Sequence, residues 1–308
     1  MEIISGIDNF PCIQDFTCVT VGTFDGLHIG HQAVLKQLKD TAMRKKLKSA
    51  VITFSPHPRE VLFPGADICF VLSKEEKIRA FSKSGIDFLV IHPFSKEFAG
   101  LPAEVFFKDL LCKKLKMKHL IKGFNNHFGK DRLSDISVIR QYGIEAGFEV
   151  TETQKLFTES HYPVSSTTVR QLIHEGKVDK AAEILGYNFF ITGKVVHGKH
   201  LGRKIGFPTA NILSDDKHKI VPKSGVYEGC CIINGIKYRV MLNIGSNPTV
   251  NADNNKIFFE AHILNFSGDL YSKEITVTLI RRLRDEKKFS SLEELKRQLE
   301  YDKIKISA

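Results

Sequence analysis

Residues 19–31 read Val-Thr-Val-Gly-Thr-Phe-Asp-Gly-Leu-His-Ile-Gly-His, an apolar strand that runs into a glycine-containing turn. An amphipathic pattern from Gln32 to Lys46 predicts a helix directly after the turn. Free backbone N–H groups and the helix dipole favour an anion at such a helix start, where His28 and His31 add side-chain donors. Two histidines at this spacing are also common as structural or solvated residues, and a metal site would need further ligands. Their position after a strand favours a site for the phosphates of a nucleotide.

Strands and helices alternate through the first part of the chain, to about residue 186. Buried parallel strands are predicted at 18–21, 50–54, 88–91 and 119–121. Helices are predicted at 32–46, 74–84, 103–114 and 134–146. This alternation predicts a doubly wound parallel α/β sheet over residues 1–186, with ligands at the carboxyl ends of the strands. Both histidines follow the first predicted strand, so the predicted fold and the histidine motif indicate the same ligand site.

The pattern changes after Gly186. Short β-type segments follow one another at 189–196, 227–233, 237–244, 257–264 and 274–280. Turn signals such as Asn234-Gly235 separate them, and most apolar residues alternate with polar ones. A compact antiparallel β-barrel is therefore predicted for residues 187–308, followed by an amphipathic C-terminal helix that Ser290 or Ser291 caps.

The composition limits the class of protein and its partners. The 308 residues suit two domains, and the net charge of +10 favours anionic partners. The basic runs at 44–46, 113–118 and 281–284 lack the interleaved aromatic residues of a base-stacking surface, so no nucleic-acid partner is expected. The six cysteines form no Cys-x-x-Cys pair, no apolar run could span a bilayer, and no signal-peptide pattern is present. We expect a cytoplasmic protein without a membrane partner, and nothing in the sequence indicates its oligomeric state.

Three further segments of the first domain fall where ligand-binding loops are expected. Residues 54–59 follow the second strand, and their His57 and Arg59 could receive an anionic group, although the loop could also be only a proline-stiffened turn. After the fourth strand, Phe124 and Phe128 could stack on a planar ring or merely cap the core. Serial hydroxyls at 165–168 open a helix, a pattern typical of a cap and, with an arginine one turn in, also of a phosphate site.

In the second domain, a segment rich in glycine and basic residues spans 193–207 and precedes Pro-Thr-Ala-Asn at 208–211. It lacks the Gly-Lys-Ser/Thr ending of a Walker loop, and its composition suits either a flap over phosphates or a surface hairpin. Thr209 and Asn211 offer oxygen atoms for Mg²⁺ on a stiffened backbone. Glu260 is an acid within an apolar strand. Unless it faces solvent, partial burial there would raise its pKa and suit it to accept a proton from a hydroxyl.

These motifs resemble those of known families. The His-x-Gly-His pattern at 28–31 resembles the signature of adenylyl-transferring nucleotidyltransferases, and the Gly-Thr-Phe-Asp-Gly lead-in at 22–26 narrows the resemblance to bacterial FAD synthetases. The segment Ser-Ser-Thr-Thr-Val-Arg at 165–170 is similar to one that closes on ATP in that family. The resemblance covers the whole first domain. It implies transfer of an adenylyl group from ATP to FMN, with release of pyrophosphate and with Mg²⁺ bridging the phosphates.

The resemblance also implies the site residues for this activity. The expected ATP-binding residues are Gly22, Phe24, His28, Gly30, His31, Ser165, Ser166, Thr167 and Arg170. The expected flavin-binding residues are Phe54, His57, Pro58, Arg59, Phe124, Asn125 and Phe128. Of these, the residues expected to act in catalysis, by positioning and charge neutralisation, are His28, His31, Asn125 and Arg170.

The second domain resembles bacterial riboflavin kinase, because its glycine-rich flap, Pro-Thr-Ala-Asn, Asn-Ile-Gly at 243–245 and the Glu260 strand occur in the order typical of that family. The resemblance implies phosphorylation of riboflavin by ATP, with Glu260 as the base for the ribityl hydroxyl and with Thr209 and Asn211 as ligands of Mg²⁺. The expected ATP-binding residues are Gly198, Gly202, Lys204, Gly206, Pro208, Thr209 and Asn211. Departures from the family pattern lie away from these positions, at Tyr187-Asn188, Asn265 and Ser272.

The whole sequence thus predicts a bifunctional enzyme that converts riboflavin to FMN and FMN to FAD, with ATP as co-substrate of both steps. One alternative is a FAD synthetase whose barrel only binds flavin, but the presence of Thr209, Asn211 and Glu260 argues against it. Another is a regulator that binds flavin or nucleic acid, and the intact motifs in both domains argue against that.

Overall fold

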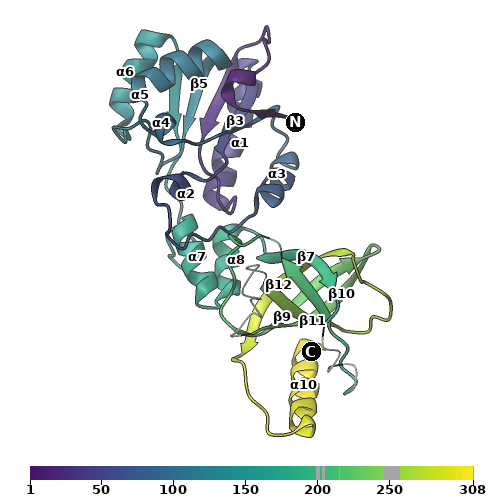
Figure 1. Cartoon of the computed structure of the whole chain (residues 1–308). Helices are drawn as coiled ribbons and strands as arrows, with labels where there is room; N and C mark the ends of the chain where they lie inside the picture. The colour runs from purple at the N-terminus through teal and green to yellow at the C-terminus, as the bar shows by residue number, and fades with distance from the viewer. Residues whose placement is uncertain (199–201, 203–204, 215, 246–256, 308) are drawn as a thin grey trace. The chain divides into compact units, whose positions relative to one another are not determined.

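The structure is a computed structural model that describes residues 1–198, 202, 205–214, 216–245 and 257–307 (Figure 1). The chain forms two compact units, Met1–Ser166 and Thr167–Ala308. The first is an α/β unit and the second carries a β-barrel, as the sequence predicts.

A six-stranded parallel sheet forms the centre of the first unit, with the strand order β1-β4-β3-β2-β5-β6. Its strands are β1 (Glu2–Ser5), β2 (Thr17–Val21), β3 (Lys48–Phe54), β4 (Phe88–His92), β5 (Met117–Lys122) and β6 (Glu149–Glu152). The four inner strands confirm the sequence prediction. The edge strands β1 and β6 are absent from that prediction, because each has four residues that are mostly exposed or half-buried and so gives little hydrophobic signal.

Helices connect these strands. They are α1 (Ile29–Lys45), α2 (Pro58–Leu62), α3 (Lys74–Ser82), α4 (Lys96–Ala99), α5 (Ala103–Val105), the π-helix η2 (Phe106–Lys114) and α6 (Ile136–Ala146), with a 3₁₀ turn η1 (Ile7–Asn9) after β1. From β2 the chain builds β3 and β4 on one side, then crosses to β5 on the other side. Ligands of doubly wound sheets bind at such a reversal of strand order, which lies here beyond the carboxyl ends of β2 and β5.

The second unit is a closed antiparallel barrel with the order β10-β11-β8-β7-β12-β9. Its strands are β7 (Phe190–Val196), β8 (Ala210–Ser214), β9 (Gly225–Ile233), β10 (Ile236–Ile244), β11 (Ile257–Ile263) and β12 (Glu274–Arg284). Asn234 and Gly235 both have positive φ, as expected for the turn of a β-hairpin. Strand β8 is not among the predicted strands.

Helices precede and follow the barrel strands in the sequence. Helix α7 (Ser166–His174) leads into the second unit, where α8 (Val178–Leu185) packs against β12. Helix α10 (Leu292–Ser307) ends the chain, and the Oγ of Ser291 accepts a hydrogen bond from the N–H of Glu294 at 3.1 Å. Of the two predicted caps, the structure therefore selects Ser291.

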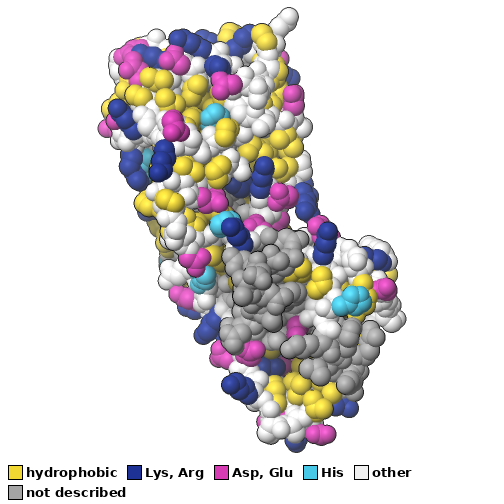
Figure 2. Space-filling model, viewed as in Figure 1, with side chains coloured by type: hydrophobic (Ala, Val, Ile, Leu, Met, Phe, Trp, Pro, Cys, Tyr) yellow, Lys and Arg dark blue, Asp and Glu magenta, His cyan; other side chains and the backbone are white. Residues whose placement is uncertain are grey.

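The basic runs of the sequence are partly paired with acids. Lys45 lies 2.7 Å from Glu149, and Lys113 and Lys114 form ion pairs with Asp109 and Asp8. On the face of the molecule shown in Figure 2, Lys and Arg side chains are interspersed with acidic and apolar ones. Within the described residues, no helix is both long and apolar enough to cross a membrane.

Candidate active sites

The turn after β2 places two histidines at the start of α1. The helix begins at Ile29, three residues before the predicted start, so His28 is its N-cap and His31 lies in its first turn. The Nδ1 of His28 accepts a hydrogen bond from the N–H of His31 at 3.3 Å, and the two rings stack with centroids 3.6 Å apart. Because Nδ1 accepts, His28 is held as the neutral tautomer that presents an N–H at Nε2.

Burial keeps both histidines uncharged. It lowers the pKa of His28 to about 4, and it lowers the pKa of His31 well below its ordinary value, with His28 and Lys77 adding to the effect. The Nδ1 of His31 is buried and has no hydrogen-bond partner among the described residues. The pair can therefore donate hydrogen bonds to a phosphate near neutral pH, but it supplies no positive charge.

The other predicted residues of this turn support the histidines. A side chain at Gly30 would crowd the ring of His28 at 3.1 Å and Val164 at 3.2 Å. Phe24 is buried and packs edge-to-face against His31, with ring centroids 5.2 Å apart. Gly22 leaves room for Phe24, since a Cβ would lie 3.1 Å from its ring.

Hydrogen bonds from distant segments fix the same turn. The buried Asp25 accepts bonds from the N–H groups of Val71 at 2.8 Å and Leu72 at 3.4 Å. Ser166 donates its Oγ–H to the carbonyl of Asp25 at 2.8 Å, which brings one of the predicted serines to this site. Thr167 and Arg170 belong to the second unit, where the Nη2 of Arg170 donates to the Oγ1 of Thr167 at 3.3 Å.

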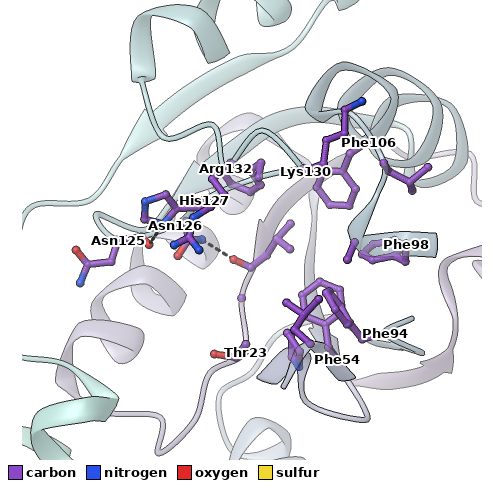
Figure 3. A pocket seen from close by; sticks show the side chains of 18 residues that line it. Thr23, Phe54, Phe94, Phe98, Phe106, Asn125, Asn126, His127, Lys130 and Arg132 are labelled. Atoms are coloured by element: carbon purple, nitrogen blue, oxygen red, sulfur yellow. Dashed lines mark hydrogen bonds between the residues drawn. The ribbon is translucent and has the colours of Figure 1, made fainter. Parts of the chain in front are cut away.

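A pocket of about 580 Å³ opens beside this turn, at the reversal of strand order (Figure 3). The predicted residues in its wall are Gly22, Phe54, Pro58, Asn125 and Phe128. Three further rings, of Phe94, Phe98 and Phe106, were missed by the sequence analysis. Figure 3 shows Phe54, Phe94 and Phe98 close together at one side of the pocket, with Asn126 and His127 at the other. Such a wall suits a flat aromatic ligand with polar edges.

Three residues predicted for flavin binding do not line this pocket. His57 caps α2 and accepts a hydrogen bond from the N–H of Arg59 at 3.1 Å, and the side chain of Arg59 is exposed. Phe124 is 47% exposed, and the ammonium group of Lys155 lies 5.5 Å from its ring centroid.

A second pocket, of about 310 Å³, lies in the barrel unit and brings four predicted residues together: Gly202, Thr209, Asn211 and Glu260. Strand register places Glu260 directly between Asn211 on β8 and Asn243 on β10. The carboxylate thus has an amide on each side within the reach of cross-strand neighbours. Glu260 is exposed, so of the two alternatives that the sequence left open the structure selects the side chain that faces solvent.

Other residues of this pocket were not predicted as site residues, among them Asn243, His262 and Arg284. The Nδ1 of His262 lies 2.8 Å from the carbonyl oxygen of Pro208, which can only accept, so this nitrogen carries the proton. Burial lowers the pKa of His262 and keeps the ring neutral. His262 thereby holds the start of the Pro-Thr-Ala-Asn segment in place.

The glycines of the predicted flap have separate roles. A side chain at Gly198 would collide with the amide of Asn211, and one at Gly202 would collide with the carbonyl of Phe207. Gly206 has a φ of +84°, which only glycine adopts readily. Lys204 lies outside the described residues.

A third pocket, of about 500 Å³, shares Thr209 with the second. Pro208, Phe266 and Tyr271 line it, and the ring of His197 stacks on Tyr271 with centroids 3.8 Å apart. In the described part of the barrel unit, these two ligand-sized cavities therefore meet at the Pro-Thr-Ala-Asn segment.

Comparison with known proteins agrees with this two-site arrangement. A family model described as FAD synthetase matches residues 12–168, and one described as riboflavin kinase matches residues 185–308. A protein of Escherichia coli (strain K12) named bifunctional riboflavin kinase/FMN adenylyltransferase is 37% identical over 306 residues, 99% of this chain and 96% of its own length. A protein of the same name from Listeria monocytogenes is 36% identical over 92% of this chain and 89% of its own length.

Among solved structures, a Streptococcus pneumoniae protein described as a macrolide-efflux protein has a TM-score of 0.88 and 31% identity. The match covers 98% of this chain and 97% of that one, so the fold similarity extends over both units. The two family matches follow the order of the two units, and the named relatives are similar over nearly the whole chain. The chain belongs to the bifunctional riboflavin kinase/FMN adenylyltransferase family.

Proposed function

We propose that the two activities of this family are divided between the two units, with FMN adenylylation in the first and riboflavin phosphorylation in the barrel. The observation that carries the first assignment is that one turn both borders the aromatic pocket and leads to the histidine pair. Gly22 and Thr23 line the pocket, and the same turn leads to His28 at the start of α1. A flavin ring held in the pocket would therefore have its phosphate near the anion-binding helix start.

The adenylyl transfer needs little covalent work from the protein. An oxygen of the FMN phosphate attacks the α-phosphorus of ATP, the bond from that phosphorus to the bridging oxygen breaks, and pyrophosphate leaves with the electron pair. The N–H groups of His28, His31 and the start of α1 would hold phosphate oxygens during this step. Asn125, in the pocket wall, would orient the flavin nucleotide, and Ser165, Ser166, Thr167 and Arg170 remain predicted ATP-binding residues.

In the barrel, Glu260 would accept the proton of the terminal ribityl hydroxyl as its oxygen attacks the γ-phosphorus of ATP and ADP leaves. The amides of Asn211 and Asn243 flank the carboxylate and can orient it toward one hydroxyl. We assign riboflavin to the 310 Å³ pocket, because leucines of α10 and Glu260 line it together. The nucleotide then belongs in the adjoining pocket with Tyr271, and Thr209 stands where the two meet.

The oxygen donors of Thr209 and Asn211 fit Mg²⁺, which prefers hard oxygen ligands and is often held largely by substrate phosphates. The described residues contain no cluster of three His, Cys, Asp or Glu side chains that could hold a metal, in keeping with a site that phosphates complete. Bound there, Mg²⁺ would neutralise part of the phosphate charge.

Two substitutions test the division of labour. Glu260→Gln is expected to lower riboflavin phosphorylation by about 10²–10⁴-fold, the usual contribution of a general base, and to leave adenylylation of supplied FMN unchanged. His28→Ala is expected to do the reverse. The measurement is chromatographic separation of riboflavin, FMN and FAD after incubation with ATP and Mg²⁺, and circular dichroism of each variant is its control for folding. Equal loss of both activities in a folded variant would contradict the assignment.

The location and the functional boundary are also proposals. All six cysteines are free thiols, which supports the predicted cytoplasmic location, since reducing compartments keep thiols unpaired. We place the functional boundary between residues 186 and 187, although packing divides the chain at 166 and groups α8 with the barrel.

A further inference from the structure

Lys77 of α3 reaches from a distant part of the sequence to the turn between β2 and α1. Its Nζ donates a hydrogen bond to the carbonyl of Thr23 at 3.0 Å, and the Oγ1 of Thr53 donates to the same oxygen at 3.2 Å. Thr23 lines the aromatic pocket and lies five residues before His28. The ammonium group therefore contacts the turn that leads from the proposed flavin site to the histidine pair.

The surroundings of this ammonium group are unusual for a lysine. The side chain is half-buried, and no ion pair to it is present within the described part of the chain. Burial lowers the pKa of the Lys77 ammonium group, and the nearby charges of Asp25 and Glu60 oppose this effect. Asp25 already accepts a hydrogen bond from the N–H of Val71, and Glu60 accepts one from the N–H of His57 at 2.6 Å. One of its three N–H groups is used by Thr23, which leaves two for a ligand.

The site needs such a charge. Burial keeps the pKa of both histidines low, so neither carries a positive charge where the strongly anionic triphosphate would bind. A lysine held in a partly dry site, with no ion pair to break among the described residues, can bind a phosphate at little cost in reorganisation.

We propose that Lys77 is a phosphate-binding residue of the adenylyl transfer, which places its ammonium group where the FMN phosphate meets the α-phosphate of ATP. This inference rests on the proposed location of the ATP phosphates at the histidine pair. As the FMN oxygen forms its bond to the α-phosphorus and the bond to pyrophosphate breaks, negative charge is spread over the oxygens of both groups. Lys77 stabilises that charge more than the charge of the separate substrates.

The test uses three substitutions of Lys77 in the full chain. Lys77→Met removes the charge and the donors, Lys77→Gln keeps an N–H for Thr23 without the charge, and Lys77→Arg keeps the charge. We expect Met and Gln to lower kcat for adenylylation about 100-fold, as for loss of one preorganised donor, with a smaller change in KM for FMN. Arg is expected to restore part of the loss. Riboflavin phosphorylation by the same samples reports on the barrel, and circular dichroism reports on folding.

Lys74→Met on the same helix is the matched control, because that side chain is exposed, and its rates are expected to equal those of the unsubstituted protein. A normal kcat for adenylylation in Lys77→Gln would overturn the inference, because a hydrogen bond to Thr23 without the positive charge would then be enough for normal activity. His28→Ala, measured in parallel, separates the two proposals. If His28→Ala abolishes adenylylation and the Lys77 variants do not, only the role of Lys77 fails. If His28→Ala has no effect, the location of the ATP phosphates is wrong.

Discussion

His28 is a helix cap that works only while its ring is uncharged. Its Nδ1 accepts from the N–H of His31, and protonation would turn this acceptor into a donor that faces a donor. Burial lowers its pKa from an ordinary value of 6.5 to about 4. The unfolded chain thus binds a proton at a higher pH than the folded chain does. His28 therefore contributes stability above about pH 6.5 that is lost as the pH falls toward 4.

We predict that the first unit loses on the order of 3 kcal/mol of unfolding free energy through this one group between about pH 6.5 and pH 4. His28→Asn keeps an acceptor at a favoured capping position and removes the titration. Urea unfolding followed by circular dichroism at several pH values should show a smaller decline of the unfolding free energy for the variant than for the unsubstituted protein. Equal declines in the two proteins would assign the acid sensitivity to other groups.

Some of the predicted site residues that line the pockets carry polar groups in short patterns, as Asn125, Thr209 and Asn211 do. Phe94 and Phe98 could not be distinguished from core residues, because a phenylalanine beside a short helix looks the same in sequence whether it faces a cavity or the interior. Lys77 carries no local signal at all, since its partner Thr23 is fifty-four positions away.

At the scale of elements, a buried ion pair joins helix α10 to the barrel beside the proposed riboflavin pocket. Asp302 is 1% exposed and lies 2.8 Å from Arg284 at the end of β12. The Nε2 of Gln298 also donates to Asp302 at 2.9 Å. Leu292, Leu295 and Leu299 of the same helix line the pocket, so the ion pair and the pocket wall depend on the same contact between helix and barrel.

Asp302→Asn is therefore expected to weaken the docking of α10 by about 3 kcal/mol, because it leaves the Arg284 charge buried without its partner. The predicted consequence is a higher KM for riboflavin and normal adenylylation of FMN. Steady-state kinetics of both reactions check it. Lys303→Ala, an exposed neighbour on the helix, should change neither. A normal KM for riboflavin in Asp302→Asn would show that α10 takes no part in binding it.

The elements themselves were predictable where the pattern is long. The alternation of strands and helices predicted the α/β unit. The Asn-Gly turn, with alternating apolar and polar residues on both sides, predicted the hairpin of β9 and β10. Short elements were not predictable: β8 follows the flap, and its five residues carry little alternation. The start of α1 was misplaced because histidine and glycine are weak helix formers, and only tertiary packing shows that the helix includes them.

At the scale of the whole molecule, each of the three pockets described above is lined by residues of one unit. The aromatic pocket is lined entirely by residues 21–132 and the two barrel pockets by residues 195–299. The riboflavin kinase match begins at residue 185, after the end of the FAD synthetase match at 168. On the proposed division of the two activities, FMN made in the barrel of one copy can therefore serve the first unit of another copy.

We therefore predict that two variants, each lacking one of the two activities, together convert riboflavin to FAD. Glu260→Gln alone should make no FAD from riboflavin, and His28→Ala alone should stop at FMN. A mixture of the two full-length variants should make FAD, because FMN released by the intact barrel of one binds the intact first unit of the other. The time course should show free FMN rising before FAD, and a flavin trap such as an excess of an FMN-binding apoprotein should suppress FAD formation. If the mixture makes no FAD although it does so from added FMN, the product passes between the units without release.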